Sequence, residues 1–290
     1  MTAALVADSR AVLAKHARSF QTASWLLPGE ARDDAAVLYA FCRLVDDIAD
    51  ECDDKVVARR DLEALQAELR KAVEPRPLVV LLHAVAARRG MDLHAAEELI
   101  DGALTDLDPV VIADEAELMR YCYLVAGTVG VLMCGVLGVT DAHARSHAVA
   151  LGEGMQLTNI CRDVAEDAGI GRVYVPASLL EAQGQTSAAV LDGTVDRAAL
   201  ARVVRTMLGT ADERYAHGFA GMGFIPARTR AAILVAAHLY RSIGLRLVDK
   251  HGADPMHGRT IVPGPGRAWA VVKGLRDHLR LLLTGRLALA

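Results

Sequence analysis

The chain has 290 residues, of which 53% are hydrophobic and only 4% aromatic, and its formal net charge is −4. This length allows one or two domains with a sizeable buried core. The slightly acidic charge excludes the broad basic face that a nucleic-acid partner would require. A composition rich in Ala and Leu and poor in aromatic residues favours helices over sheets, so we predict an all-α fold with a single domain over residues 1–290.

Hydrophobic residues that recur every three or four positions predict helices along the whole chain. Short segments with glycine or proline separate them, and the most irregular is GIGRVYVP at 169–176. The predicted helices cover residues 3–18, 32–50, 55–73, 78–89, 92–104, 115–139, 143–166, 196–219, 226–249 and 266–285.

The stretch from Tyr121 to Thr140 carries no charge and is about as long as a membrane span. Its four glycines lower its hydrophobicity and would let another helix or an apolar ligand approach the backbone closely. Because the other segments are amphipathic, we expect a buried central helix. The alternative is a non-catalytic, membrane-embedded or prenyl-binding helical protein.

The five cysteines are scattered and odd in number, and no two of them form a C-x-x-C pair. This pattern is typical of reduced core residues and favours a cytoplasmic location. The first 20 residues mix charged and apolar side chains, and they lack the continuous apolar stretch of a signal peptide.

Two aspartates, Asp46 and Asp50, lie four residues apart near the end of the helix predicted over 32–50. This spacing places both carboxylates on one helix face, where they repel each other. A solvated acidic face is the usual explanation of such a pair. Here the apolar stretch 38–42 comes shortly before them and would hold them at the edge of a buried wall, where unpaired charge is costly. A divalent cation would compensate that charge.

The same spacing recurs in QLTNICRDVAED at 156–167, where Asp163 and Asp167 are four residues apart and Asn159 comes one turn earlier. Three oxygen donors therefore share one helix face. Oxygen donors without a His or Cys cluster suit Mg²⁺ or Mn²⁺, and Mg²⁺ commonly completes its shell with water and phosphate oxygens. The two motifs together predict a metal site for a phosphorylated substrate.

Arginines near these motifs could contact phosphate bidentately, or could simply pair with the aspartates: Arg43, Arg162 and Arg172. A nucleotide is disfavoured, because the sequence has neither a GxxxxGK[S/T] loop nor a GxGxxG motif after a strand. Small and apolar residues that could line a long channel lie in the uncharged stretch: Ala126, Gly127, Val129, Gly130 and Met133. A diphosphate at the mouth and a hydrocarbon in the channel describe a prenyl diphosphate.

These motifs resemble the squalene and phytoene synthase family over most of the chain, from about residue 19 to residue 259. The resemblance lies in SF at 19–20, YAFCRLVDDIAD at 39–50, YCYLVAGTVG at 121–130, QLTNICRDVAED at 156–167 and GRVYVP at 171–176. It implies a helical isoprenoid synthase bundle with a central prenyl cavity. The two aspartate motifs would face each other across this cavity and hold metal ions on the diphosphates.

The resemblance also implies roles for individual residues. The metal ligands would be Asp46, Asp50, Asn159, Asp163 and Asp167. The catalytic residues would be the four aspartates of this set together with Tyr39 and Tyr121. Substrate contacts would come from Ser19, Phe20, Arg43, Ala126, Val129, Gly130, Gln156, Arg162, Arg172, Tyr174 and Tyr240. Aromatic rings could also shield carbocations, except that core packing is the favoured role of Phe41.

The implied reaction joins two allylic prenyl diphosphates head to head through a cyclopropylcarbinyl diphosphate. Squalene formation would consume NADPH, whereas phytoene formation ends by proton loss, and no nicotinamide site is recognisable. Ser24 and Ala36 are small and would leave room for long chains. We therefore expect two geranylgeranyl diphosphates to give phytoene without NADPH. The alternative is two farnesyl diphosphates giving presqualene diphosphate or a squalene-type C30 product.

The C-terminal stretch 266–290 combines Trp269 and several basic residues with many leucines. It could lie as a helix on the inner face of the membrane, although a terminal helix packed on the core is the simpler expectation. Similarity to the family weakens after Arg259, where IVPGPG replaces an expected basic residue. The sequence leaves the oligomeric state open.

Overall fold

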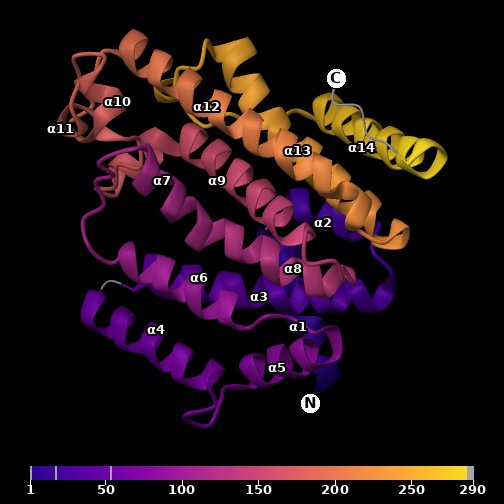
Figure 1. Cartoon of the computed structure of the whole chain (residues 1–290). Coiled ribbons are helices and arrows are strands. Elements are labelled where there is room, and N and C mark those ends of the chain that lie inside the picture. Colours follow the sequence, from indigo (N-terminus) through magenta and orange to yellow (C-terminus); the bar gives the residue numbers. More distant parts are fainter. Residues whose placement is uncertain (1, 17, 53, 286–290) are drawn as a thin grey trace.

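The structure is a computed structural model that describes residues 2–16, 18–52 and 54–285 (Figure 1). Within these ranges every regular element is a helix, apart from one isolated parallel bridge between Val111 and Val173. The elements are α1 Thr2–His16, α2 Arg18–Ser24, α3 Gly29–Glu51, α4 Lys55–Leu69, α5 Pro77–Arg89, α6 His94–Thr105, α7 Glu115–Cys122, η1 Tyr123–Gly127, α8 Thr128–Leu137, α9 Ala144–Gly169, α10 Ala177–Glu181, α11 Ser187–Leu191, α12 Arg197–Ala220, η2 Gly221–Phe224, α13 Ala227–His251, η3 Pro255–His257 and α14 Gly264–Thr284. The predicted all-α class is confirmed.

Several predicted helix boundaries differ from those in the structure. The helix predicted over 55–73 ends at Leu69, because Lys71 adopts a left-handed φ of 56° and prolines follow. The helix predicted over 3–18 ends at His16, and the separate helix α2 follows it. Two short helices, α10 and α11, lie in a region for which no helix was predicted.

Two apolar cores stabilise the fold. The first lies among α3, α4, α5, α6 and α8, and its fully buried side chains include Phe41, Leu62, Leu82, Ile100 and Leu132. The packing role favoured for Phe41 is therefore confirmed. The second core lies among α7, α9, α12 and α13, which run beside one another in Figure 1, and it includes Leu157, Leu200, Tyr215, Phe219 and Leu234.

The uncharged stretch forms a central helix, but a π-helical turn, η1, separates α7 from α8. Its glycines allow the backbone to contact α9 directly. A Cβ atom at Gly130 would lie 2.3 Å from the carbonyl oxygen of Ala148, and one at Gly152 would lie 2.2 Å from that of Ala126. These contacts explain why the sequence needs glycine at a helix interface, where it otherwise weakens helices.

Two helical segments, Glu115–Leu137 and Ala227–His251, are long and apolar enough to cross a membrane. The expectation that only the first is so apolar is wrong. In each, 44% of the most apolar window is buried, and both segments line the same internal cavity. This lining role gives their apolar side chains a use inside the protein.

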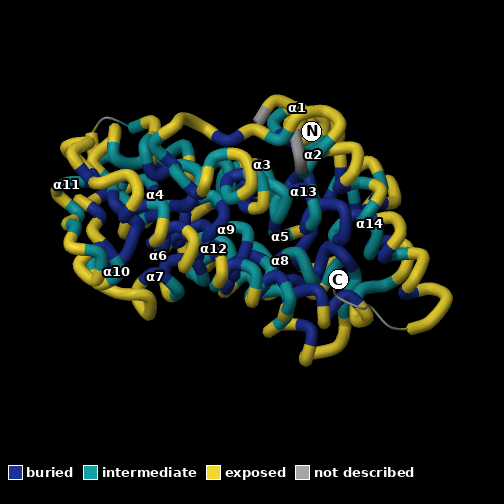
Figure 2. The backbone as a smooth tube through the Cα atoms, turned by 90° about the horizontal axis from the view of Figure 1, so that it is seen from above, coloured by how far each residue is buried: buried dark blue, intermediate teal, exposed yellow. Residues whose placement is uncertain are grey.

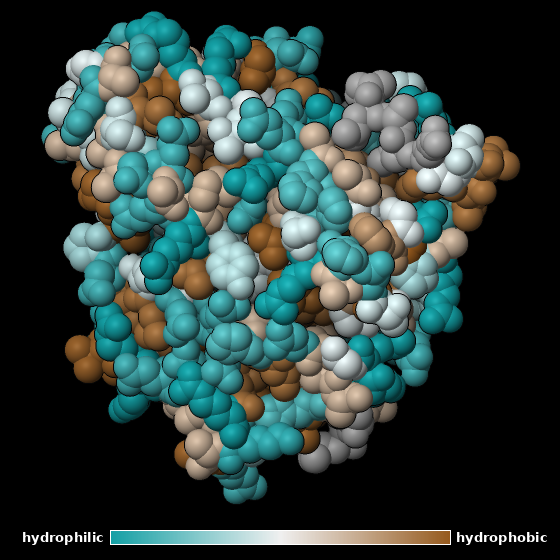
Figure 3. Space-filling view, viewed as in Figure 1, coloured by the Kyte–Doolittle hydropathy of each residue, from teal (hydrophilic) through white to brown (hydrophobic). Residues whose placement is uncertain are grey.

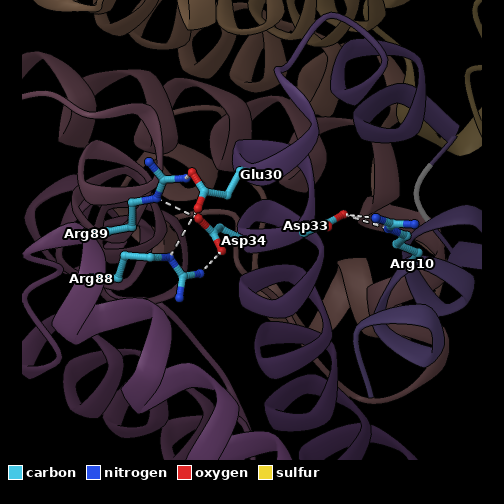
Figure 4. Close-up of polar contacts among 6 residues, drawn as sticks. All are labelled: Arg10, Glu30, Asp33, Asp34, Arg88 and Arg89. Atoms are coloured by element: carbon cyan, nitrogen blue, oxygen red, sulfur yellow. Dashed lines mark hydrogen bonds and ion pairs between the residues drawn. The ribbon is translucent and has the colours of Figure 1, made fainter. Parts of the chain in front are cut away.

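Ion pairs fix the first half of α3 against its neighbours (Figure 4). Asp34 is only 2% exposed, and it accepts hydrogen bonds from Arg88 and Arg89 of α5. Arg89 also pairs with Glu30, one turn earlier on α3. On the other side, Arg10 of α1 donates a 2.6 Å hydrogen bond to Asp33. The helix that carries the first acidic motif is thereby anchored on both sides.

Candidate active site

An internal cavity of about 400 Å³ is lined from both cores. Its wall is mainly apolar and comes from α1, α2, α3, α6, η1, α8, α9, α12, η2 and α13. Its polar lining residues include Asp46, Gln156 and Asn159. The lining also includes His147, which lies on α9 several turns before Asn159. Since α9 rises 1.5 Å per residue, Asn159 and His147 are on the order of 18 Å apart along the helix. The cavity is therefore long, apolar and polar at one side.

Most of the predicted channel residues do line this cavity, namely Phe20, Tyr39, Ala126, Val129, Gly130, Met133, Gln156 and Tyr240. Ser24 lines it too, but Ala36 is fully buried against Leu13 and is not part of the wall. The part of the chain-length argument that used Ala36 is therefore wrong. Ser19 lies in α2, and its side chain is outside the described part of the structure.

The first acidic motif lies on the last turns of α3. Asp46 lines the cavity, and burial raises its pKa to about 7, with a further contribution from the neighbouring carboxylate of Asp50. Asp50 accepts a 2.7 Å hydrogen bond from Arg172, which follows α9. Arg43 instead pairs with Asp47 and Glu51 of its own helix.

The second acidic motif lies near the end of α9. Burial raises the pKa of Asp167 to about 7, and the carboxylate of Asp163 adds to the effect, whereas the Arg172 guanidinium opposes it. Arg162 donates a 2.7 Å hydrogen bond to Asp163. Arg259 contributes a second guanidinium, 3.7 Å from Asp163. Both motifs thus contain a carboxyl group that burial and repulsion make hard to ionise.

Asp106, just after α6, carries a charge that acts on both motifs, and no sequence pattern singled it out. Tyr121 and Tyr174 donate hydrogen bonds of 2.9 and 2.8 Å to its two carboxylate oxygens, and their rings stack 4.7 Å apart. Its charge acts on both Asp46 and Asp167. Asp106 shares no helical spacing with either motif, so only the tertiary structure could reveal it.

The segment after α9 is held beside Asp106 by the backbone. Val173 donates a hydrogen bond to the carbonyl oxygen of Val110 and accepts one from the amide of Ile112. Arg172 donates to the backbone carbonyl of Asp106 at 3.0 Å and Tyr174 donates to its carboxylate, so both residues of the GRVYVP segment hold Asp106. Tyr121 lies behind Asp106, away from the cavity wall.

Three aromatic rings border the cavity. The ring of Phe20 lies 6.4 Å from that of Tyr39 and 5.1 Å from that of Tyr240. Burial raises the pKa of Tyr240 to about 12, against the influence of Arg162, so its hydroxyl stays protonated at neutral pH. Apolar lining residues that the sequence analysis did not single out include Leu99, Val125, Leu151, Met155, Ile233 and Ala236.

The oxygen donors around the cavity are of the kind that bind a divalent cation. In the described ranges, no group of three or more His, Cys, Asp or Glu side chains is placed to hold one ion. However, Asn159 Oδ1 is buried without a hydrogen-bond partner, and Asn159, like Asp46, lines the cavity. Such a donor set suits Mg²⁺, which takes one or two carboxylates and completes its shell with water and phosphate oxygens.

The chain is similar to known proteins over most of its length. A model of the squalene/phytoene synthase family matches residues 13–265. A 15-cis-phytoene synthase from a Paracoccus species is 36% identical over 255 residues, which cover 84% of this chain and 82% of that protein. A phytoene synthase from Thermus thermophilus is 41% identical over 238 residues, which cover 80% of this chain and 79% of that protein.

Solved structures give the same picture. A dehydrosqualene synthase in complex with a ligand has a TM-score of 0.85 at 26% identity, covering 95% of this chain and 96% of that one. A squalene synthase from Alicyclobacillus acidocaldarius has a TM-score of 0.77 at 25% identity, covering 86% and 95% of the two chains.

The fold and the site define a helical enzyme whose apolar cavity reaches two acidic helices. The chain belongs to the squalene/phytoene synthase family, which consists of prenyltransferases.

Proposed function

We propose that this enzyme condenses two molecules of geranylgeranyl diphosphate head to head and produces phytoene. The observation that carries the proposal is the meeting of both acidic helices beside one long apolar cavity, joined by the hydrogen bond from Arg172 to Asp50. Such a cavity holds hydrocarbon, and its polar side holds diphosphate. The two phytoene synthases described above support the choice of product.

Divalent metal ions, Mg²⁺ or Mn²⁺, belong to the proposal. Asp46, Asp50, Asn159, Asp163 and Asp167 would hold them, together with phosphate oxygens. When bound, the ions supply the positive charge that draws off a diphosphate leaving group. Arg172 and Arg259 lie beside the acidic motifs, and their guanidinium groups would contact the diphosphate oxygens.

The cavity wall then controls the cation that remains. Phe20, Tyr39 and Tyr240 present ring faces that stabilise an allylic cation, and the apolar lining excludes water that would quench it. The double bond of the second substrate attacks this cation, and loss of a proton to the diphosphate released in the first ionisation gives a cyclopropylcarbinyl diphosphate. Its ionisation and rearrangement end in loss of a second proton, which the released diphosphate accepts. No reductant is needed, so NADPH is not part of the reaction.

A C30 product from two farnesyl diphosphates is the second candidate. It is favoured by the similarity to the dehydrosqualene and squalene synthase structures. The small Ser24 in the cavity wall argues for the longer chain, because a bulky side chain there would shorten the cavity.

Product analysis distinguishes these candidates. The purified protein would be incubated with Mg²⁺ and either farnesyl or geranylgeranyl diphosphate, each with and without NADPH, beside an Asp46→Asn variant. We expect a C40 hydrocarbon from geranylgeranyl diphosphate without NADPH and none from the variant. A C30 product or accumulated presqualene diphosphate would move the assignment to the C30 branch. A folded protein that binds substrate and yields no product would establish the non-catalytic alternative.

We also propose that the enzyme works in the cytoplasm, against the inner face of the membrane. All five cysteines are free thiols and two are fully buried, which suits a reducing compartment. An uncharged C40 product is insoluble in water and would have to enter a bilayer.

A further inference from the structure

Helix α14 presents an apolar stripe that nothing in the described structure covers. Six of its hydrophobic side chains are exposed: Trp269 (59%), Val272 (51%), Leu275 (42%), Leu279 (55%), Leu282 (52%) and Leu283 (76%). Figure 2 shows exposed backbone along the outer edge of this helix, and in Figure 3 hydrophobic side chains reach the surface at the edge where Figure 1 draws α14. A water-soluble protein rarely leaves so many large apolar residues together on one helix.

The stripe lies opposite the face by which α14 packs on the protein. Its buried residues are Ala270, Gly274, Asp277 and Leu281, spaced for one face of a helix. At about 100° per residue, the centre of the exposed apolar set falls on the other side of the helix. The buried face packs closely on α13: a Cβ atom at Gly274 would lie 2.7 Å from Val235, and Asp277 forms a hydrogen bond with His238.

Basic side chains flank this stripe. Lys273, Arg276 and Arg280 follow one another along one side of it, and the Lys273 ammonium lies 6.0 Å from the centre of the Trp269 ring. Arg276 pairs with Asp277, whereas neither Lys273 nor Arg280 pairs with a carboxylate in the ranges that the structure describes. The chain as a whole carries a net charge of −4, so the positive charge of this flank is opposite in sign to the net charge of the protein.

We propose that α14 is a docking surface for a lipid bilayer with anionic headgroups. Its leucines and Trp269 would enter the boundary between headgroups and acyl chains, while Lys273, Arg276 and Arg280 would contact lipid phosphates. A second copy of this chain fits the surface less well, because two copies paired through α14 would bring their basic flanks together without compensating carboxylates. Membrane binding by α14 does not depend on the proposed function. Only its role in delivering an apolar product rests on that function.

The position of α14 suits delivery of an apolar product. It packs along α13, whose Ile233, Ala236 and Tyr240 line the cavity on the other side. Two packed helices, α13 and α14, therefore separate the cavity from the exposed stripe. A protein held in this way would keep the cavity about two helix diameters, roughly 20 Å, from the bilayer into which the hydrocarbon dissolves.

Flotation with vesicles tests the proposal on the full-length protein. Vesicles of neutral phosphatidylcholine would be compared with vesicles containing about 30% phosphatidylglycerol. The apolar variant is Leu279→Ser with Leu283→Ser, and the charge variant is Lys273→Glu with Arg280→Glu. Matched controls on α4 are Val56→Ser, at a side chain 78% exposed, and Arg60→Glu, at one 73% exposed. Activity with detergent-dispersed substrate and circular dichroism establish that each variant is folded.

We expect the wild type and both controls to float with anionic vesicles, and binding to neutral vesicles to be at least tenfold weaker. Each α14 variant should lose at least tenfold in binding to anionic vesicles while keeping its activity in detergent. Equal binding of the variants and the wild type would overturn the proposal. So would sedimentation analysis in which the apolar variant turns a dimer into a monomer without loss of vesicle binding, which would make the stripe an interface between copies. Because vesicle binding needs no substrate, failure of the proposed catalytic function would leave this result unchanged.

Discussion

Arg172 links the first acidic motif to Asp106, since its Nη1 donates a 2.7 Å hydrogen bond to Asp50 of α3 while its Nη2 donates to the backbone carbonyl of Asp106. Only the forked guanidinium can make both contacts at once. We therefore expect Arg172→Lys to lower kcat/KM about 10- to 100-fold, the equivalent of roughly 1.5–3 kcal/mol for one lost charged hydrogen bond. Steady-state kinetics would measure the change. Arg145→Lys, which alters a half-exposed ion pair with Asp92, is the control, and an equal loss in both variants would contradict the role given to Arg172.

The pH dependence of stability should reveal the crowded carboxyl groups of the two acidic motifs. Burial and neighbouring carboxylates raise the pKa of Asp46 and Asp167 to about 7, so the folded protein keeps protons that the unfolded chain releases near pH 4. Stability from this source is therefore present at low pH and falls as the pH rises from about 4 to about 7. Without divalent cations, we expect Asp46→Asn to flatten the fall between pH 5 and pH 7, by an amount that solvent screening limits because the Asp46 side chain is exposed. Urea unfolding at several pH values measures it, and identical profiles for both proteins would refute the elevated pKa.

Metal binding should stabilise the folded protein in the opposite pH range. Mg²⁺ with inorganic pyrophosphate would replace protons on the acidic motifs, so the increase in Tm should be larger at pH 8 than at pH 5.5. We expect Asn159→Ala to reduce this increase, because it removes the unpartnered Oδ1 that lines the cavity. Asp108→Asn, at a side chain 74% exposed, should leave it unchanged. Calorimetric scans test the prediction, and an increase in Tm that Asn159→Ala does not alter would exclude this residue as a ligand.

Ser24 should limit the length of the product. Its side chain lines the cavity and is 8% exposed, so Ser24→Phe would fill space that a long prenyl chain needs. Overpacking costs about 1–3 kcal/mol, which corresponds to a roughly 5- to 150-fold loss with geranylgeranyl diphosphate. The shorter farnesyl diphosphate should be affected less, and the C30 to C40 product ratio should rise. Ser24→Ala, which adds no bulk, is the control, and an unchanged ratio in Ser24→Phe would remove Ser24 from the length-setting wall.

Asp34 should matter far more for stability than the adjacent Asp33. Asp34 is buried between Arg88 and Arg89, whereas Asp33 pairs with Arg10, whose side chain is 55% exposed (Figure 4). We expect Asp34→Asn to lower the free energy of unfolding by about 3 kcal/mol, as for other broken buried pairs. Asp33→Asn should cost about 1 kcal/mol or less. Urea unfolding measures both, and equal effects would contradict the anchoring of α3 by α5.

Local patterns in the sequence were sufficient to predict the helices and the acidic, metal-binding character of the two motifs. The spacing of Asp46 and Asp50, and its repetition at Asp163 and Asp167, depends only on the 3.6-residue period of a helix. The predicted ends of the helices were less accurate, because a helix end depends on single residues such as Lys71 with its left-handed backbone. The π-helical turn after α7 was not predicted; it lies where the backbone at Ala126 approaches Gly152 of α9, a tertiary contact that no local pattern indicates.

The sequence by itself determined the helical class, the acidic helices and the residues that resemble a prenyltransferase family. Each of these follows from the identity and spacing of residues within a short segment. Only the tertiary structure decided which side chains meet. The charge of Asp106 comes to act on both motifs, Arg43 pairs within its own helix, and Ala36 packs away from the cavity while Ser24 lines it. Periodicity states which residues share a face of a helix. What that face contacts depends on packing between segments far apart in the chain, which no local pattern records.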